Sequence, residues 1–263
     1  MVENNSNALD RLEQEIESEF IDETRDVLAG LEVMLGNFES GLIDGVKALV
    51  TLRRSFRSLE ARSQSLDKAT MNIVTHRASE YLSDSQELER SNVVDVQMFI
   101  DVLRKLLDQN SGAGAEHSSE LVRQLPSRRI VDFDVVEAAR KMNVEMLLVI
   151  PDRATSRYVE RELAACGYRV SNAGHFFKGL ELAVRTQPDF IICGAVLDEA
   201  SGIDLIRALS GISATAHTPV ALLTSYAVGH PSLAELPANA AVIRKGATFG
   251  EDLALALARF KIT

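Results

Sequence analysis

The segment MLLVIPDRATSRYVERELAACGYRV, residues 146–170, decides the fold of the second half of the chain. It opens with five apolar residues before Pro151 and Asp152, continues with a polar stretch at helical spacing, and passes Gly167 into a second apolar run. Glycine often follows the last turn of a helix, because it adopts a left-handed backbone without strain. The segment therefore predicts a strand, a helix and a second strand.

The same alternation continues to the end of the chain. A doubly wound order of this kind builds a parallel sheet whose two faces are covered by helices. In such sheets chemistry lies at the carboxyl ends of the strands, where the loops converge. We therefore expect an α/β domain with a five-stranded parallel sheet. Its strands are expected at 146–150, 168–170, 190–193, 220–223 and 241–243, and its helices at 154–166, 177–185, 203–209 and 251–260, with a short helix after the fourth strand.

The first half of the chain has a helical pattern throughout. All six prolines lie at or after position 126, and neither proline nor glycine occurs from 46 to 111. Apolar residues recur at helical spacing in four segments, so each predicted helix has one apolar face. Four such helices bury one another most simply as an antiparallel four-helix bundle. We predict a helical bundle at 1–110, a linker and connector at 111–142, and the α/β domain at 143–263.

Charge divides the chain at the same place and limits the classes of partner. The 263 residues have a formal net charge of −10; residues 1–125 hold 23 acidic and 13 basic side chains, and the remainder holds 15 of each. Nucleic-acid binders usually have a basic surplus, so we expect no nucleic-acid partner. No apolar run is long enough to span a membrane and no secretory signal begins the chain, so we expect no membrane insertion and a cytoplasmic location. The chain has two cysteines, too few for a disulfide framework, and this number fits a reducing compartment.

The second half resembles the receiver domain of response regulators over about 120 residues, through LLVIPD, ERELAACGYRV, PDFIICGAVLDEASGIDLI, VALLTS and VIRKG. Receivers have an acidic pair after the first strand and a phosphoaccepting aspartate at the end of the third. A Ser or Thr follows the fourth strand, and Lys-Pro follows the fifth. On this sequence these positions are Pro151 and Asp152, Gly194, Thr224, and Lys245 with Gly246.

This resemblance implies a receiver fold without receiver chemistry. Gly194 supplies no nucleophile, and Asp152 is the one obvious magnesium ligand that remains. We therefore expect no catalytic residue, no cofactor and no metal site. Thr224 and Lys245 either make hydrogen bonds in a vestigial pocket or serve the scaffold. Asp198, four residues past Gly194, is either a substitute phosphoacceptor or a solvated loop residue.

The first half resembles the histidine phosphotransfer domain at the front of chemotaxis-type histidine kinases, over about 100 residues. The resemblance rests on FIDETRDVLAGLEVML, LRRSFRSLEARS, VTHRASEYL and VVDVQMFIDVLRKLLD. The family's exposed histidine falls on Arg57, whose guanidinium stays protonated and cannot accept a phosphoryl group. His76 aligns with a histidine that the family often carries on its third helix. It is either a structural residue or a displaced phosphoacceptor.

Four arginines interrupt this acidic half on its second predicted helix. The apolar stripe of that helix turns the other way, so we expect these side chains to be exposed. They form either a solvated face paired with acids such as Glu60, or a docking patch for an acidic partner surface. A small anionic ligand would find no glycine-rich cradle there. The four candidates for partner binding are Arg53, Arg54, Arg57 and Arg62.

Together these features predict a non-catalytic adaptor of two-component signalling. It would regulate a histidine kinase, a phosphotransferase or a response regulator by binding, independently of its own phosphorylation. The alternative is a phosphorelay protein that uses His76 or Asp198 as a non-standard acceptor. The long first helix also allows a homodimer through pairing with its copy.

Overall fold

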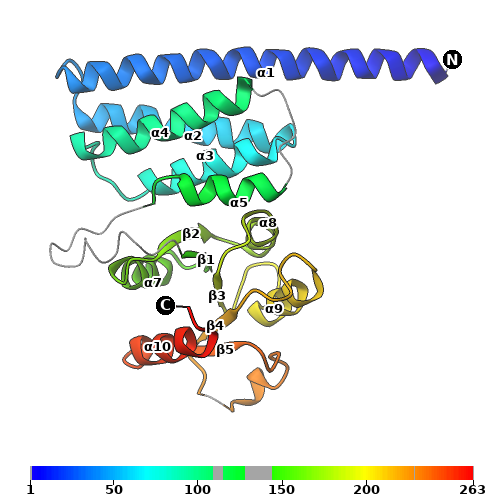
Figure 1. The fold of residues 1–263 in the computed structure, drawn as a ribbon, viewed down its shortest axis with the longest axis vertical. Helices are drawn as coiled ribbons and strands as arrows, with labels where there is room; N and C mark the ends of the chain where they lie inside the picture. The colour runs from blue at the N-terminus through cyan, green and yellow to red at the C-terminus, as the bar shows by residue number, and fades with distance from the viewer. Residues whose placement is uncertain (1, 109–114, 128–143, 228, 263) are drawn as a thin grey trace. The chain divides into compact units, whose positions relative to one another are not determined.

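The computed structural model describes residues 2–108, 115–127, 144–227 and 229–262. The chain divides into two compact units, Met1–Ala113 and Gly114–Thr263. The first is helical and the second contains the sheet, as the fold class predicted (Figure 1). Most of the linker that we expected at 111–142, namely 111–114 and 128–142, lies outside the described residues.

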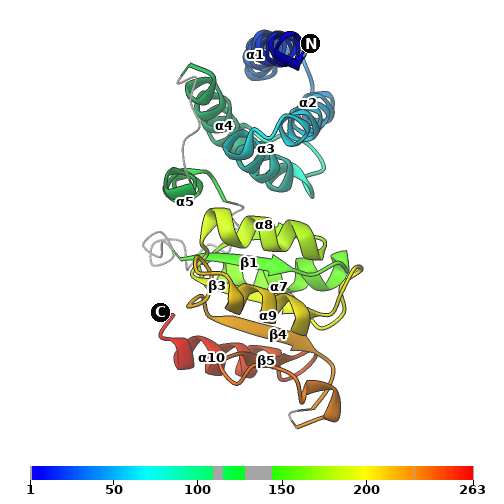
Figure 2. The same ribbon diagram turned by 90° about the vertical axis from the view of Figure 1, so that its right-hand side faces the viewer.

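The first unit is a four-helix bundle. Helix α1 contacts α2 and α4, and α3 contacts the same two helices, so the four form a closed ring; Figure 2 shows α2 and α4 on either side of α1. The core includes Phe56 of α2 and Phe99 of α4, whose ring centroids lie 6.4 Å apart edge to face. The helices are α1 (Val2–Glu39), α2 (Gly45–Ser65), α3 (Ala69–Leu82) and α4 (Arg90–Asp108).

Helix α1 is much longer than its neighbours and runs beyond their ends (Figure 1). Phe20 is the first of its described side chains to be buried, whereas Leu12 and Ile16 are 53% and 42% exposed. Leu12 and Ile16 are four residues apart and share a face. Self-association through this extension stays a prediction, which light scattering of the purified chain measures directly.

The second unit holds a parallel sheet in the order β2-β1-β3-β4-β5. Each strand is followed by a helix except β4, after which the described residues contain one 3-10 turn, η1 (Pro231–Leu233). The strands are β1 (Glu145–Val149), β2 (Arg169–Ala173), β3 (Phe190–Gly194), β4 (Val220–Thr224) and β5 (Ala241–Arg244). The helices between and after them are α7 (Arg153–Ala165), α8 (Phe176–Thr186), α9 (Gly202–Gly211) and α10 (Phe249–Phe260).

Both faces of the sheet are covered. Helices α7 and α10 pack on one face through Val159, Leu163 and Leu253, and α8 and α9 contact β1, β3 and β4. The start of α9 passes close to the end of β3, because a Cβ on Gly202 would lie 2.1 Å from the carbonyl oxygen of Gly194. Any larger side chain at position 202 would therefore force the start of α9 away from the end of β3.

The described part of the connector begins with a helix that belongs to the second unit. Helix α5 (Ala115–Gln124) packs on α8, and Val122 and Leu125 are buried. Arg123 forms a bidentate ion pair with Asp189, with N···O distances of 2.8 and 3.1 Å, and Arg169 donates to the carbonyl of Val122 at 3.1 Å. The described part of the expected linker is therefore an ordered addition to the α/β unit.

Candidate functional site

The arginine-bearing helix α2 has its apolar side in the bundle core, where Leu52, Phe56 and Leu59 are buried. Arg53 departs from our expectation that all four arginines are exposed. Its guanidinium is partly buried and donates to three carbonyl oxygens at the end of α3. The distances are 2.7 and 3.0 Å to Leu82, 2.8 Å to Ser83 and 2.5 Å to Ser85.

A helix leaves its last four carbonyls without intrahelical donors, and its C-terminus carries a partial negative charge. Arg53 satisfies carbonyls of this kind, because its long side chain reaches sideways from α2 to the neighbouring helix. The expectation that Arg53 is exposed is therefore corrected, and its role in docking a partner stays a prediction. Arg53 is a structural cap of α3.

Arg62 is also engaged within the bundle. Its guanidinium pairs with Glu23 of α1 and lies over the ring of Phe20, 5.5 Å from the centroid. A cation over an aromatic face is attracted by the ring quadrupole. Arg62 therefore ties α2 to α1, and its availability to a partner is reduced.

Arg54 and Arg57 are the two members of the cluster that fit the expectation of exposure. Within the described part of the chain, neither forms a hydrogen bond or an ion pair. Val46 and Val50 lie on the same helix and are 53% and 59% exposed. Val46, Val50 and Arg54 are spaced by four residues, so they share one stripe that leads to Arg57. We call Val46, Val50, Arg54 and Arg57 the α2 stripe.

Replacing Arg53 by alanine is expected to lower the free energy of unfolding of the bundle by about 2–3 kcal/mol, because buried carbonyls lose a charged donor. Arg54→Ala removes the adjacent, exposed guanidinium and is expected to change stability by less than about 0.5 kcal/mol. Urea denaturation of the full chain, followed by far-ultraviolet circular dichroism, measures both. Equal effects of the two substitutions would contradict the capping role.

His76 of α3 is held by Glu60 of α2. Its Nδ1 lies 2.8 Å from Oε1 of Glu60, and the two side chains are 14% and 24% exposed. Asn72 adds a second tie between the helices, since its side-chain amide donates to the carbonyl of Glu60 at 2.9 Å. Glu60 therefore links α2 to α3 through both His76 and Asn72. The contact with Glu60 supports a structural role for His76, and the alternative role as a displaced phosphoacceptor stays a prediction.

In the second unit, the parallel register brings the expected receiver positions to one edge of the sheet. Gly194 and Thr224 end β3 and β4, and Arg244, which precedes Lys245, pairs with Thr224 across β4 and β5. Asp152 follows β1 but serves α7 as its N-cap. Its Oδ2 accepts hydrogen bonds from the backbone N–H and the hydroxyl of Thr155, at 2.8 and 2.5 Å. These bonds lower the pKa of the Asp152 carboxyl, and the charge of Lys245 adds to the effect.

Gly194 is the position where a receiver would carry its phosphoacceptor. A Cβ there would lie 3.5 Å from the carbonyl oxygen of Val196 and 3.8 Å from that of Val149, which are ordinary contacts. The backbone at this position therefore accommodates a Cβ, and the sequence supplies none. Thr224 is buried, and its hydroxyl accepts a hydrogen bond from the backbone N–H of Tyr226 at 3.1 Å. Asp198 is exposed in the loop between β3 and α9.

The loop after β5 departs from the receiver pattern in its backbone. Lys245 is exposed, and its N–H donates to the carbonyl of Thr224 at 2.8 Å. Gly246 stands where the pattern has proline, and its φ is +103°. Proline is locked near −65°, so the backbone conformation at this position excludes it. Lys245-Gly246 therefore differs from the Lys-Pro of the receiver pattern in backbone conformation as well as in residue type.

Arg244 and Asp252 form an ion pair beside this loop that the sequence analysis missed. The guanidinium donates to both carboxylate oxygens at 2.7 Å, and the backbone N–H of Arg244 donates to Oδ2 at 2.9 Å. Asp252 is buried in the first turn of α10, so the pair fastens α10 to β5. The two residues are eight apart, and no sequence periodicity marks such a contact.

Stability of the second unit is expected to depend on Asp252 in acid. Its hydrogen bonds to Arg244 hold the pKa of the folded carboxyl below its usual value. As pH falls, the unfolded state therefore binds the proton before the folded state does. The contribution of this ion pair to the free energy of unfolding is complete above the unfolded pKa near 3.9, and it is lost as pH falls through the lower folded pKa. Asp252→Asn is expected to lower the melting temperature at pH 7, and the gap to the original protein should close toward pH 2. A gap that is constant with pH would contradict this assignment.

Neither cysteine is suited to nucleophilic chemistry. Burial raises the pKa of the Cys193 thiol to about 12, and burial and the charge of Glu162 raise that of Cys166. Across the described ranges, no group of three His, Cys, Asp or Glu side chains could hold a metal ion. No described helix is both long and apolar enough to cross a membrane.

Comparison with known proteins finds similarity over parts of this chain. No family model matches the chain. The chain is 35% identical over 80 residues to the DNA-binding dual master transcriptional regulator RpaA of Synechocystis sp., a match that covers 30% of this chain and 33% of that protein. The chain therefore spans about a third of the length of this curated relative.

Solved structures similar to the chain include chemotaxis protein CheY4 of Vibrio cholerae, at 22% identity and a TM-score of 0.40. The match covers 44% of this chain and 98% of CheY4. Another is the receiver domain of a sensor histidine kinase of Pseudomonas aeruginosa, at 20% identity and a TM-score of 0.41, over 45% of this chain and 98% of that domain. The resemblance of the first unit to a phosphotransfer domain stays a prediction. Each of these two matches covers less than half of this chain.

Proposed function

We propose that this protein is a two-component signalling adaptor that regulates a histidine kinase, phosphotransferase or response regulator by docking to it, without carrying a phosphoryl group itself. The observation that carries the proposal is the α2 stripe. Two exposed guanidinium groups without a described partner lie beside two exposed valines, in a half of the chain that is otherwise acidic. A partner surface with carboxylates around an apolar centre would match it.

The chemistry of the second unit supports a binding role. Gly194 has no nucleophile, and Asp152 is engaged with Thr155 at the start of α7. Phosphorylation of a receiver needs a carboxylate that attacks phosphorus and a set of oxygen ligands for Mg²⁺. An adaptor needs neither, because occupying a docking face lowers the concentration of productive encounters between the partner and its substrates.

Affinity capture from the native cell tests this proposal, with the intact protein as bait. The expected result is recovery of a histidine kinase, phosphotransferase or response regulator that binds the purified chain directly. Recovery of no such protein, or of one that fails to bind the purified chain, would contradict the adaptor role.

A second candidate function rests on the contact between His76 and Glu60. A carboxylate that accepts a hydrogen bond from Nδ1–H fixes the imidazole tautomer with its lone pair on Nε2, as a phosphoryl acceptor requires. Incubation with acetyl phosphate and Mg²⁺, followed by intact-protein mass spectrometry, separates the two functions. A phosphorylated species that disappears with His76→Ala or Asp198→Ala would favour the relay. No phosphorylated species is expected for an adaptor.

A further inference from the structure

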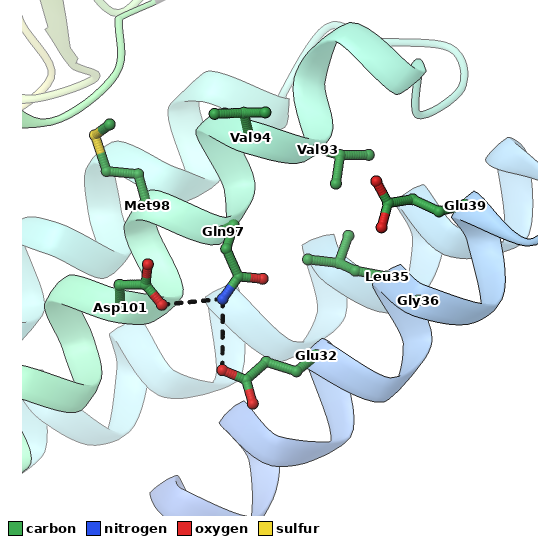
Figure 3. Close-up of a pocket in the computed structure, with 9 residues that line it drawn as sticks. All are labelled: Glu32, Leu35, Gly36, Glu39, Val93, Val94, Gln97, Met98 and Asp101. Carbon is green, nitrogen blue, oxygen red and sulfur yellow. Dashed lines mark hydrogen bonds between the residues drawn. The ribbon is translucent and has the colours of Figure 1, made fainter.

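A groove of about 460 Å³ lies between α1 and α4 (Figure 3), and its lining includes no residue of the α2 stripe. Its floor is apolar, because Leu35 of α1 and Val93 of α4 are 2% and 7% exposed. Gly36 leaves the α1 side open, since a Cβ there would meet no atom within 4 Å. The groove is therefore bounded by two rigid helices, and no described side chain of the bundle fills it at Gly36.

Large apolar side chains on α4 extend this floor to the surface. Val94 and Met98, which are four residues apart, are 70% and 40% exposed and both line the groove. A pocket for a small molecule usually encloses its ligand, whereas this surface is open along the helices. Exposed apolar residues in a row along one helix, as on α4, suit an extended apolar stripe on a partner.

Carboxylates form the rim, and the residues that line the groove include three acids and no base. Glu32 is neutralised in part, because Arg104 donates to its Oε2 at 2.7 Å. The side-chain amide of Gln97 donates to Asp101 at 2.9 Å. Because this amide is neutral, the hydrogen bond does not offset the negative charge of the carboxylate. Arg90 lies nearby but donates to the backbone carbonyl of Glu39 and not to its carboxylate. Glu39 and Asp101 thus keep negative charge at the edges of an apolar floor.

We propose that this groove binds one basic amphipathic helix of a partner protein. The apolar face of that helix would cover Leu35, Val93, Val94 and Met98, and its lysines or arginines would meet Glu39 and Asp101. An anionic lipid surface or a nucleic acid is disfavoured by the acidic rim. The proposal goes beyond the adaptor function above, because it concerns a different pair of helices and a partner of opposite charge.

A synthetic helix tests the groove. The probe is a fluorescein-labelled peptide of about 18 residues made of lysine, leucine and alanine, with leucines at i, i+3, i+4 and i+7. A peptide of the same composition in scrambled order controls for simple charge attraction. Fluorescence anisotropy with the full chain is expected to show saturable binding at least about tenfold tighter for the patterned peptide. Methyl resonances of Val94 and Met98 are expected to shift on binding.

Two variants make the result specific to the groove. Glu39→Lys with Asp101→Lys reverses the rim charge and is expected to weaken binding about tenfold or more. Gly36→Phe fills the groove from the α1 side, in open space, and is expected to weaken binding without loss of helix. The matched control is Glu13→Lys with Asp26→Lys, which reverses two exposed acids on α1 outside the groove.

The proposal is overturned if the scrambled peptide binds as well as the patterned one, or if the control reversal weakens binding as much as the rim reversal. Methyl shifts confined to the acidic extension of α1 would also overturn it. None of these outcomes bears on the α2 stripe, whose partner is acidic.

Discussion

Binding of the two-component partner should fall about a hundredfold or more when Arg54 and Arg57 are both changed to glutamate. Each reversal turns an attraction to an acidic partner surface into a repulsion, and about 1.4 kcal/mol for each charge gives this factor. Both side chains are exposed and unpaired among the described residues, so the bundle should keep its stability. Calorimetric titration of the purified partner, with thermal melts of each variant, measures both quantities.

The matched control is Arg11→Glu together with Lys105→Glu. Both residues are exposed on the same unit but lie on α1 and α4, and the change in net charge is identical. Binding should stay within about twofold of the original value if docking is local to α2. Equal losses in the two double variants would mean that the partner responds to the overall charge of the bundle and not to the α2 stripe. Weaker binding after Val46→Ser with Val50→Ser would show that the valines take part.

The second large effect is expected from restoring receiver carboxylates. Pro151→Asp with Gly194→Asp adds two carboxylates beside Asp152, and a Cβ at position 194 makes only ordinary contacts. The double variant should bind Mg²⁺ saturably and accept one phosphoryl group from acetyl phosphate at position 194. In that step a carboxylate oxygen attacks phosphorus and acetate leaves. The original protein should do neither.

The single variant Pro151→Asp is the control, because it gains a metal ligand but no nucleophile. Intact-protein mass spectrometry and calorimetric titration with MgCl₂ distinguish the three proteins. Failure of a well-folded double variant to bind Mg²⁺ would show that backbone changes, such as the positive φ of Gly246, have removed the site as well as its side chains.

The α/β architecture could be predicted from the sequence because β1, β3 and β4 are short, largely apolar runs. All five residues of β1, and all five of β3 and β4, are buried in the structure, and each run is flanked by helical spacing. The four helices of the bundle could be predicted as readily, because each has one face of apolar residues at helical spacing. These signals lie within single elements, so no knowledge of distant contacts was required.

Contacts between distant elements were not predictable in the same way. Arg53 and Arg57 are four apart and lie on neighbouring positions of one helix face, yet Arg53 caps α3 through main-chain oxygens about thirty positions away. The sequence gives no sign of unpaired carbonyls. Helix α5 was missed because one buried apolar residue within it, Val122, and another just after it, Leu125, are too few for a periodic signal. Its partner α8 follows more than fifty positions later.

One measurement tests most directly the claim that this protein acts by binding and not by phosphoryl transfer. It is the rate at which the identified partner gains or loses its own phosphoryl group, with the original chain, with His76→Ala and Asp198→Ala combined, or with Arg54→Glu and Arg57→Glu combined. We predict that the first double variant alters the partner's rate as the original chain does, and that the second has no effect on it. Loss of regulation in the first double variant, with regulation kept in the second, would contradict the account.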